Sequence, residues 1–244
     1  EATFTLAEEG QYVIYTIIKD KAGNVTYINS NEGVIIDKTN PSEPQIMITT
    51  AEPAQGIYNG DVDFKINVID PESNGTYAGL EKVECTILNQ GTETQSFSYN
   101  DKLEDKTARV QSLERTETII AEKNNSNYVT IQVYAKDYAG NDTIATKDLK
   151  IDTKEPEVEI DFDNNNPLNG KYYKDTRTAT IKVKERNFDE DAVNLSITNT
   201  DGTMPAVSDW HISPEAGKTD EAINYRTVTF AADGDYTMAM SCTD

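Results

Sequence analysis

The sequence predicts an all-β protein made of tandem antiparallel β-sandwiches, and three observations support this fold class. Apolar and polar residues alternate in short segments such as 62–68 and 179–183, which is the period of a half-buried strand. Turn-forming pairs such as Asn59-Gly60 and Asp201-Gly202 separate these segments. No part of the sequence combines a sustained helical period with capping residues. We therefore expect an almost helix-free chain.

The chain also repeats itself. Residues 3–20 read TFTLAEEGQYVIYTIIKD, and residues 227–244 read TVTFAADGDYTMAMSCTD, at a constant offset of 224 positions. A third copy, NYVTIQVYAKD, lies at 127–137, and the aspartates that end the three copies are 117 and 107 residues apart. This spacing is about the size of one small sandwich. We expect a window from a longer array, with both ends inside a repeat unit, and such arrays act mainly through geometry and reach.

The middle unit, residues 41–152, divides into strands at its turns. We expect strands near 44–50, 62–69, 82–89, 93–99, 110–121, 128–136 and 143–151. Seven short antiparallel strands over about 110 residues are typical of an immunoglobulin-like sandwich. The sequence therefore predicts one complete domain of this type here.

The flanking segments match parts of the same unit. Residues 153–244 contain strand patterns at 156–162, 177–184, 192–199, 223–231 and 235–243, and we expect an immunoglobulin-like domain without its final strand. Residues 1–40 match the last three strands of a truncated unit.

The boundaries between these units carry a shared pattern. Each has an aspartate followed four positions later by a proline, Asp37 with Pro41 and Asp152 with Pro156. Proline fixes an extended backbone, so the linkers are short and neighbouring domains should be stiffly related.

Taken together, these motifs resemble the bacterial Ig-like repeats of Gram-positive cell-surface and secreted proteins. The resemblance rests on Gly-x-Tyr at 10–12, on Asp-x-Ala-Gly-Asn at 20–24 and 137–141, and on the Asp-x-x-x-Pro boundaries. It implies an exported multidomain protein at the bacterial cell surface or wall. Its neighbours would be further Ig-like repeats of the same polypeptide.

The composition excludes several partners. The formal net charge is −21 and the sequence pI is near 4.3, so the surface repels nucleic acid and anionic lipid. The longest apolar runs are too short for a membrane span. An acidic surface keeps a chain soluble and can attract cations such as Ca²⁺.

The two cysteines lie in different units. Cys85 aligns with Leu195, and Cys242 aligns with Ala135 and Ile18, all of them apolar positions on the inner side of a strand. We therefore expect both thiols to be buried, reduced and unpaired.

Carboxylates are expected to converge at the junctions between units. In an immunoglobulin-like sandwich, the second and sixth strands end at the pole that the incoming linker reaches. This places Asp37, Asp70 and Asp137 together at one junction, and Asp152, Glu185 and Asp244 together at the next. Ca²⁺ prefers six to eight oxygen ligands and would relieve the repulsion within each trio. The alternative is that each carboxylate accepts N–H groups of its own turn.

Three functions are compatible with these features. The leading interpretation is a non-enzymatic spacer or stalk repeat of a secreted bacterial surface protein. The second is an adhesive or carbohydrate-binding module that recognises a glycan or a host protein through its loops, and a solvent-facing aromatic cluster in one unit alone would favour it. An enzyme is disfavoured, because no nucleophile–base pair or paired acid site is visible and the one histidine, His211, has no evident partner.

Overall fold

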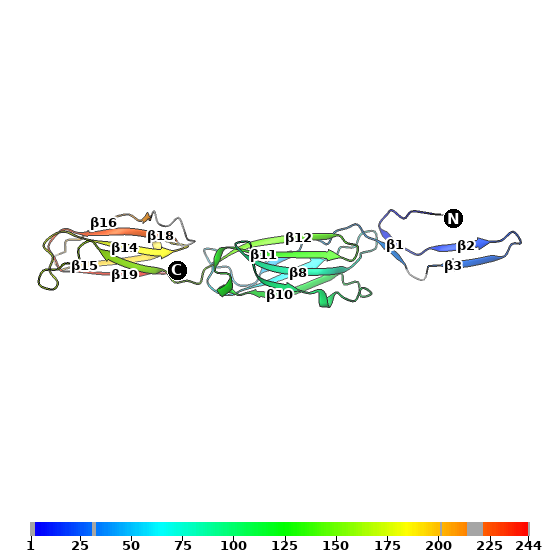
Figure 1. Ribbon diagram of the computed structural model, residues 1–244, viewed down its shortest axis with the longest axis horizontal. Coiled ribbons are helices and arrows are strands. Elements are labelled where there is room, and N and C mark those ends of the chain that lie inside the picture. Colours follow the sequence, from blue (N-terminus) through cyan, green and yellow to red (C-terminus); the bar gives the residue numbers. More distant parts are fainter. Residues whose placement is uncertain (1–2, 31–32, 201, 214–221, 244) are drawn as a thin grey trace. The chain divides into compact units, whose positions relative to one another are not determined.

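The computed structural model describes residues 3–30, 33–200, 202–213 and 222–243, and this part of the chain is almost entirely β-structure (Figure 1). Its helices are three single 3₁₀ turns, η1 (Asn100–Lys102), η2 (Ala121–Lys123) and η3 (Glu190–Ala192). The predicted all-β class is confirmed. The chain divides into two compact units, Glu1–Thr153 and Lys154–Asp244. None of the described helices is long and apolar enough to cross a membrane.

Two stacked sheets form the centre of the first unit. One sheet has the order β10-β7-β5, and the other has the order β6-β12-β11-β8-β9. Neighbouring strands are antiparallel, except that β6 runs parallel to β12. The strands are β5 (Gln45–Ile48), β6 (Ile57–Tyr58), β7 (Val62–Ile69), β8 (Leu80–Asn89), β9 (Thr92–Ser98), β10 (Ser112–Ile119), β11 (Ser126–Asp137) and β12 (Asp142–Ile151). The arrangement is that of a β-sandwich.

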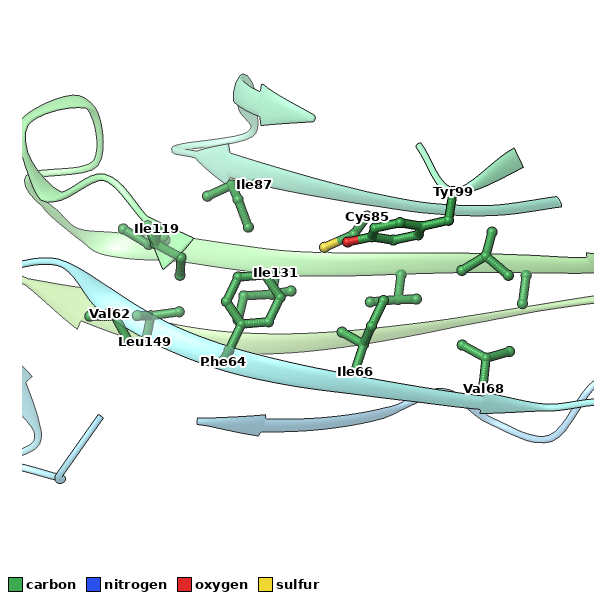
Figure 2. Close-up of a cluster of buried hydrophobic side chains, with 14 of the residues drawn as sticks. Val62, Phe64, Ile66, Val68, Cys85, Ile87, Tyr99, Ile119, Ile131 and Leu149 are labelled. Carbon is green, nitrogen blue, oxygen red and sulfur yellow. The ribbon is translucent and has the colours of Figure 1, made fainter. Parts of the chain in front are cut away.

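The core of the sandwich lies between these two sheets, where alternate side chains point inward (Figure 2). Val62, Phe64, Ile66 and Val68 of β7 are fully buried, while the residues between them are at least partly accessible. Fully burying one such aliphatic or aromatic side chain contributes about 1.5–3 kcal/mol. The alternation seen in the sequence is therefore the physical origin of the two-layer fold.

Residues 41–152 contain one strand that the sequence pattern did not predict. Ile57 and Tyr58 form β6, which pairs with Lys150 and Ile151 of β12, so residues 41–152 contain eight strands and not seven. Two residues are too few to show a period, and this explains why the pattern gave no signal for them.

The described residues between 10 and 36 form two small antiparallel ribbons with four strands in all, one more than the three predicted. One pairs β1 (Gly10–Tyr12) with β4 (Val34–Ile36), and the other pairs β2 (Tyr15–Lys19) with β3 (Val25–Asn29). The Tyr12 hydroxyl donates to the Glu8 carbonyl oxygen at 2.9 Å. The equivalent Tyr236 donates to Ala232 at 3.1 Å. Each hydroxyl therefore ties its strand, β1 or β19 (Tyr236–Cys242), to the segment just before it.

The second unit has a five-stranded sheet and a two-stranded sheet. The larger has the order β13-β14-β18-β16, with β17 also paired to β18, and the smaller pairs β15 with β19. The strands are β13 (Glu157–Phe162), β14 (Arg177–Glu185), β15 (Val193–Asn199), β16 (Ala206–Val207), β17 (His211–Ile212), β18 (Ala222–Phe230) and β19 (Tyr236–Cys242). A smaller apolar cluster centred on Ala179, Ile181 and Val228 lies within this unit.

The two cysteines differ in burial. Cys85 is fully buried in the core, and burial raises the pKa of its thiol to about 12, as expected for an inert small hydrophobe. Cys242 is only half-buried, so the expectation of burial was wrong for this residue. In the described residues β19 pairs with β15 alone, and this leaves its other edge uncovered. Neither of these two described cysteines forms a disulfide.

Shortening one core side chain should test the sandwich. We expect Phe64→Ala to lower the free energy of unfolding by about 3–5 kcal/mol, because it opens a cavity between the sheets. Met47 of β5 is 60% exposed, and Met47→Ala should change stability by less than about 0.5 kcal/mol. Denaturant unfolding measures both variants, and equal effects would contradict the assigned core.

Candidate metal centre

Three carboxylates from distant parts of the sequence meet at one pole of the first unit. Asp37 follows β4 in the linker, Asp70 follows β7, and Asp137 is the last residue of β11. Each offers a carboxylate oxygen within 4.8 Å of the others. Asp70 and Asp137 are fully buried and Asp37 is 8% exposed. The structure thus brings together the first trio named from the sequence, which we call the Asp37 cluster.

The members of the second named trio are placed differently. Asp152 is buried in the first unit, and Glu185 is buried at the end of β14 in the second unit. One oxygen of Glu185 accepts the backbone N–H groups of Arg186 and Asn187, at 2.7 and 3.0 Å. Asp244 lies outside the described residues. Among the described residues, the Asp37 cluster is therefore the candidate metal centre.

The linker carboxylate is held by two backbone amides. One oxygen of Asp37 accepts the N–H of Thr39 at 3.0 Å, and the other accepts the N–H of Ala78 at 2.6 Å. Ala78 belongs to the connection between β7 and β8. Asp37 therefore fastens the linker to a loop of the sandwich.

Asp70 is the least satisfied member of the cluster. Its Oδ2 accepts the N–H of Gly79 at 2.6 Å, whereas its buried Oδ1 has no hydrogen-bond partner in the described structure. Gly79 has a φ of +89°, and a Cβ there would lie 2.9 Å from the Arg109 Cα, so this donor position requires glycine. A fully buried carboxylate oxygen without a partner is costly unless a proton or a cation neutralises it.

Asp137 is fixed by the turn that follows it. Its two oxygens accept the backbone N–H and the side-chain N–H of Asn141, at 2.9 and 2.7 Å. The Asn141 side chain also donates to the Asp37 carbonyl oxygen at 3.3 Å. The turn-capping alternative is thus correct for Asp137, and the same turn holds it against the linker.

A second copy of this turn, at Asp20, shows what the turn's hydrogen bonds do to an aspartate that has no other carboxylate packed against it. Asp20 accepts the same two bonds from Asn24, at 2.8 and 2.7 Å, but it is exposed. The hydrogen bonds to Asn24 lower the pKa of Asp20. At Asp137, burial and the nearby Asp37 charge outweigh the equivalent bonds and raise the pKa. Burial beside other carboxylates is therefore what distinguishes the Asp37 cluster.

The electrostatics of the cluster are most evident at Asp70. Burial raises the pKa of its carboxyl to about 6, and the charges of Asp37 and Asp137 add to the shift. The Gly79 N–H and the Arg109 guanidinium oppose it. A bound cation would act in their direction, since it favours the ionised carboxylate.

The donor set suits a hard cation. All three side chains are carboxylates, which favours Ca²⁺, Mg²⁺ or Mn²⁺ over metals that prefer sulfur or imidazole. Ca²⁺ accepts six to eight oxygens in flexible geometry, whereas Mg²⁺ demands a near-ideal octahedron. Hydrogen bonds from Thr39, Ala78, Gly79 and Asn141 already constrain the three carboxylates. Flexible coordination, completed by water, therefore fits the residues best.

Glu9 also contributes to this pole, although the sequence analysis did not single it out. Its Oε1 accepts the backbone N–H of Lys38 and the hydroxyl of Thr39, both at 2.8 Å, and its Oε2 accepts the Ser73 hydroxyl at 2.7 Å. Glu9 thus joins the N-terminal ribbons, the linker and the β7–β8 connection. The repeat offered a weak signal, because the position 224 residues later is Asp233, which is also acidic.

No protein-family model matches this sequence, and a search of curated proteins finds no match either.

The raised pKa of Asp70 predicts a specific pH dependence in chelator. The folded state holds the proton of Asp70 more tightly than the unfolded state, whose aspartates titrate near 3.9, so this group stabilises the fold at low pH. That contribution should be lost as the pH rises from about 4 to about 6 and should then level off.

Asp70→Asn provides the test, because asparagine carries no charge at any of these pH values. The stability of the variant relative to wild type should rise between pH 4 and pH 6.5, as measured by denaturant unfolding in chelator. A difference that stays constant with pH would contradict the assignment to Asp70.

Proposed function

We propose that this chain is a non-enzymatic structural spacer in which a divalent cation, best fitted by Ca²⁺, fastens a linker to its sandwich. The observation that carries the proposal is the Asp37 cluster. One of its carboxylates belongs to the linker and two lie at the ends of sandwich strands, and all three are buried together.

The position of the cluster relates the cation to stiffness. Asp37 and Lys38 are already bound by Ala78 and Glu9, so the start of the linker has little freedom. A cation bound by Asp37, Asp70 and Asp137 would add a crosslink between three segments far apart in sequence. It would bind the assembled arrangement only, so it would stabilise the fold by mass action. A spacer depends on that rigidity, because its task is to hold neighbouring parts at a fixed distance.

The internal repeats support the same role. Residues 1–40, 41–152 and 153–244 are proposed to be Ig-like units, and the resemblance to bacterial surface repeats favours a location outside the cell, at the surface or wall. Their partners would be further repeats of the same polypeptide. Calcium sites of extracellular modules have dissociation constants of about 10⁻⁴–10⁻³ M, and three already hydrogen-bonded carboxylates suit that range.

The competing proposal is an adhesive module that recognises a glycan or a host protein. A solvent-facing aromatic cluster confined to one unit would favour it. Exposed tyrosines occur in both units and in the N-terminal ribbons, with Tyr128, Tyr172 and Tyr27 being 67%, 61% and 76% exposed. Aromatic exposure therefore singles out no unit as a binding module, and the spacer remains the leading proposal.

A thermal melt with and without Ca²⁺ tests the spacer proposal. With about 10 mM Ca²⁺, a site in the expected affinity range should stabilise the wild type by about 1.5–2.5 kcal/mol relative to chelator. Asp137→Asn should lose most of this gain. Asp20→Asn alters the equivalent turn in the N-terminal ribbons, where the aspartate is exposed. This variant should keep the gain.

Small-angle X-ray scattering provides a second readout, because bound Ca²⁺ should reduce the flexibility of the chain. If the wild type and Asp137→Asn melt alike and neither responds to Ca²⁺, the three aspartates serve only as turn caps and linker anchors.

A further inference from the structure

A hollow of about 400 Å³ opens on the first unit beside Tyr138. It is lined by two glutamates, three lysines, an asparagine and a tyrosine, namely Glu81, Glu104, Lys82, Lys106, Lys136, Asn100 and Tyr138. These residues come from the first positions of β8, from η1 and the loop after it, and from the end of β11 and the residue that follows it. The volume falls in the range of small-ligand sites, which are about 300–1,000 Å³. We call this feature the Tyr138 hollow.

The aromatic wall of the hollow is fixed at both ends. The backbone N–H of Tyr138 donates to the Gly79 carbonyl oxygen at 2.9 Å, and its hydroxyl donates to the carbonyl oxygen of the buried Leu103. The Lys106 ammonium lies 5.5 Å from the centre of the ring. Lys106 is exposed, and a cation–π contact at an exposed site is weak, so a ligand can displace it.

The hollow offers both donors and acceptors. The Asn100 Oδ1 accepts the Val83 N–H at 3.2 Å, which fixes the amide, while its Nδ2 group has no acceptor among the residues that the structure describes. The Glu104 carboxylate likewise has no hydrogen-bond or ion-pair partner within that part of the chain. Lys136 is held at 2.7 Å from Glu81, so an ammonium and a carboxylate stand side by side at the wall.

We propose that the Tyr138 hollow binds a neutral saccharide unit. A sugar ring has a C–H face that packs on an aromatic ring, and its hydroxyls both donate and accept hydrogen bonds. A fixed tyrosine surrounded by an amide donor, a carboxylate acceptor and a mixed ion pair matches that chemistry. An apolar ligand would leave these polar groups unpaired. An anionic ligand would be repelled at long range by a chain of net charge −21, and the hollow itself is of mixed charge, with three lysines and two glutamates.

This inference does not rest on the spacer function, since a spacer can carry a binding site on one of its units. The two sites share Gly79, however. Its N–H binds Asp70 and its carbonyl oxygen binds Tyr138, so the calcium concentration must be kept constant in every comparison.

The test begins with the complete 244-residue chain on an array of immobilised oligosaccharides. The array should contain neutral glucose-, galactose-, mannose- and N-acetylglucosamine-based probes, with uronate- and sialate-bearing probes as the acidic set. At least one neutral probe should bind, and isothermal titration calorimetry should then give its affinity. Exclusive binding of acidic probes, or no binding at about millimolar concentration, would overturn the proposal.

Three variants locate the site. Tyr138→Ala removes the aromatic wall, and Asn100→Asp keeps the acceptor for Val83 while removing the two side-chain N–H donors. Each should weaken binding of the neutral probe by about tenfold or more. Tyr128→Ala removes an exposed tyrosine of β11 that does not line the hollow. This variant should bind like wild type.

Melting temperatures identify any variant that fails to fold. If Tyr138→Ala proves unstable, Asn100→Asp alone decides. Wild-type affinity in a folded Asn100→Asp variant, or an equal loss in Tyr128→Ala, would place binding elsewhere and refute the proposed site.

Discussion

The constraint on which the junction depends is the burial of like charges. Asp37, Asp70 and Asp137 lie within 4.8 Å of one another and are almost inaccessible to water, so ionising all of them together is costly. Backbone amides and the Asn141 side chain compensate for part of this cost. The unpartnered oxygen of Asp70 is the part that remains. A proton or a cation must neutralise this oxygen. The protonation or metal occupancy of the Asp37 cluster therefore depends on the pH and the cation concentration of the solution.

The same alternating pattern that builds the sandwich also assembles this cluster. Strands β7 and β11 belong to opposite sheets and end at the same pole. Asp70 directly follows β7, and Asp137 is the last residue of β11. Because β7 ends at Ile69, Asp70 must lie at this pole of the sandwich. The preceding linker, which carries Asp37, reaches the same pole. The convergence could therefore be predicted from strand order alone. The hydrogen bonds that orient the carboxylates could not, since they come from Ala78 and Gly79, in a connection without regular structure.

The sequence predicted strands more reliably than edges. Alternation over five or more residues located β7, β11 and β14, and the alignment of Cys85 with Leu195 placed Cys85 correctly in the core. It failed where the outcome depends on a neighbour that local pattern does not reveal. Cys242 has an inward position but an uncovered strand edge, and the two-residue strand β6 exists only because β12 is beside it. Glu9 was missed because its role arises from contacts 29 to 64 positions away.

The placement of Asp37 before the sandwich that buries it has a consequence for where this chain can be divided. A cut at the linker proline, Pro41, would remove Asp37 and its bond to Ala78. The same cut would remove Glu9, which binds the Ser73 hydroxyl of the β7–β8 connection. Asp70 and Asp137 would then lose the segment that covers them, so the sandwich is complete only when the residues that precede its first strand are kept with it.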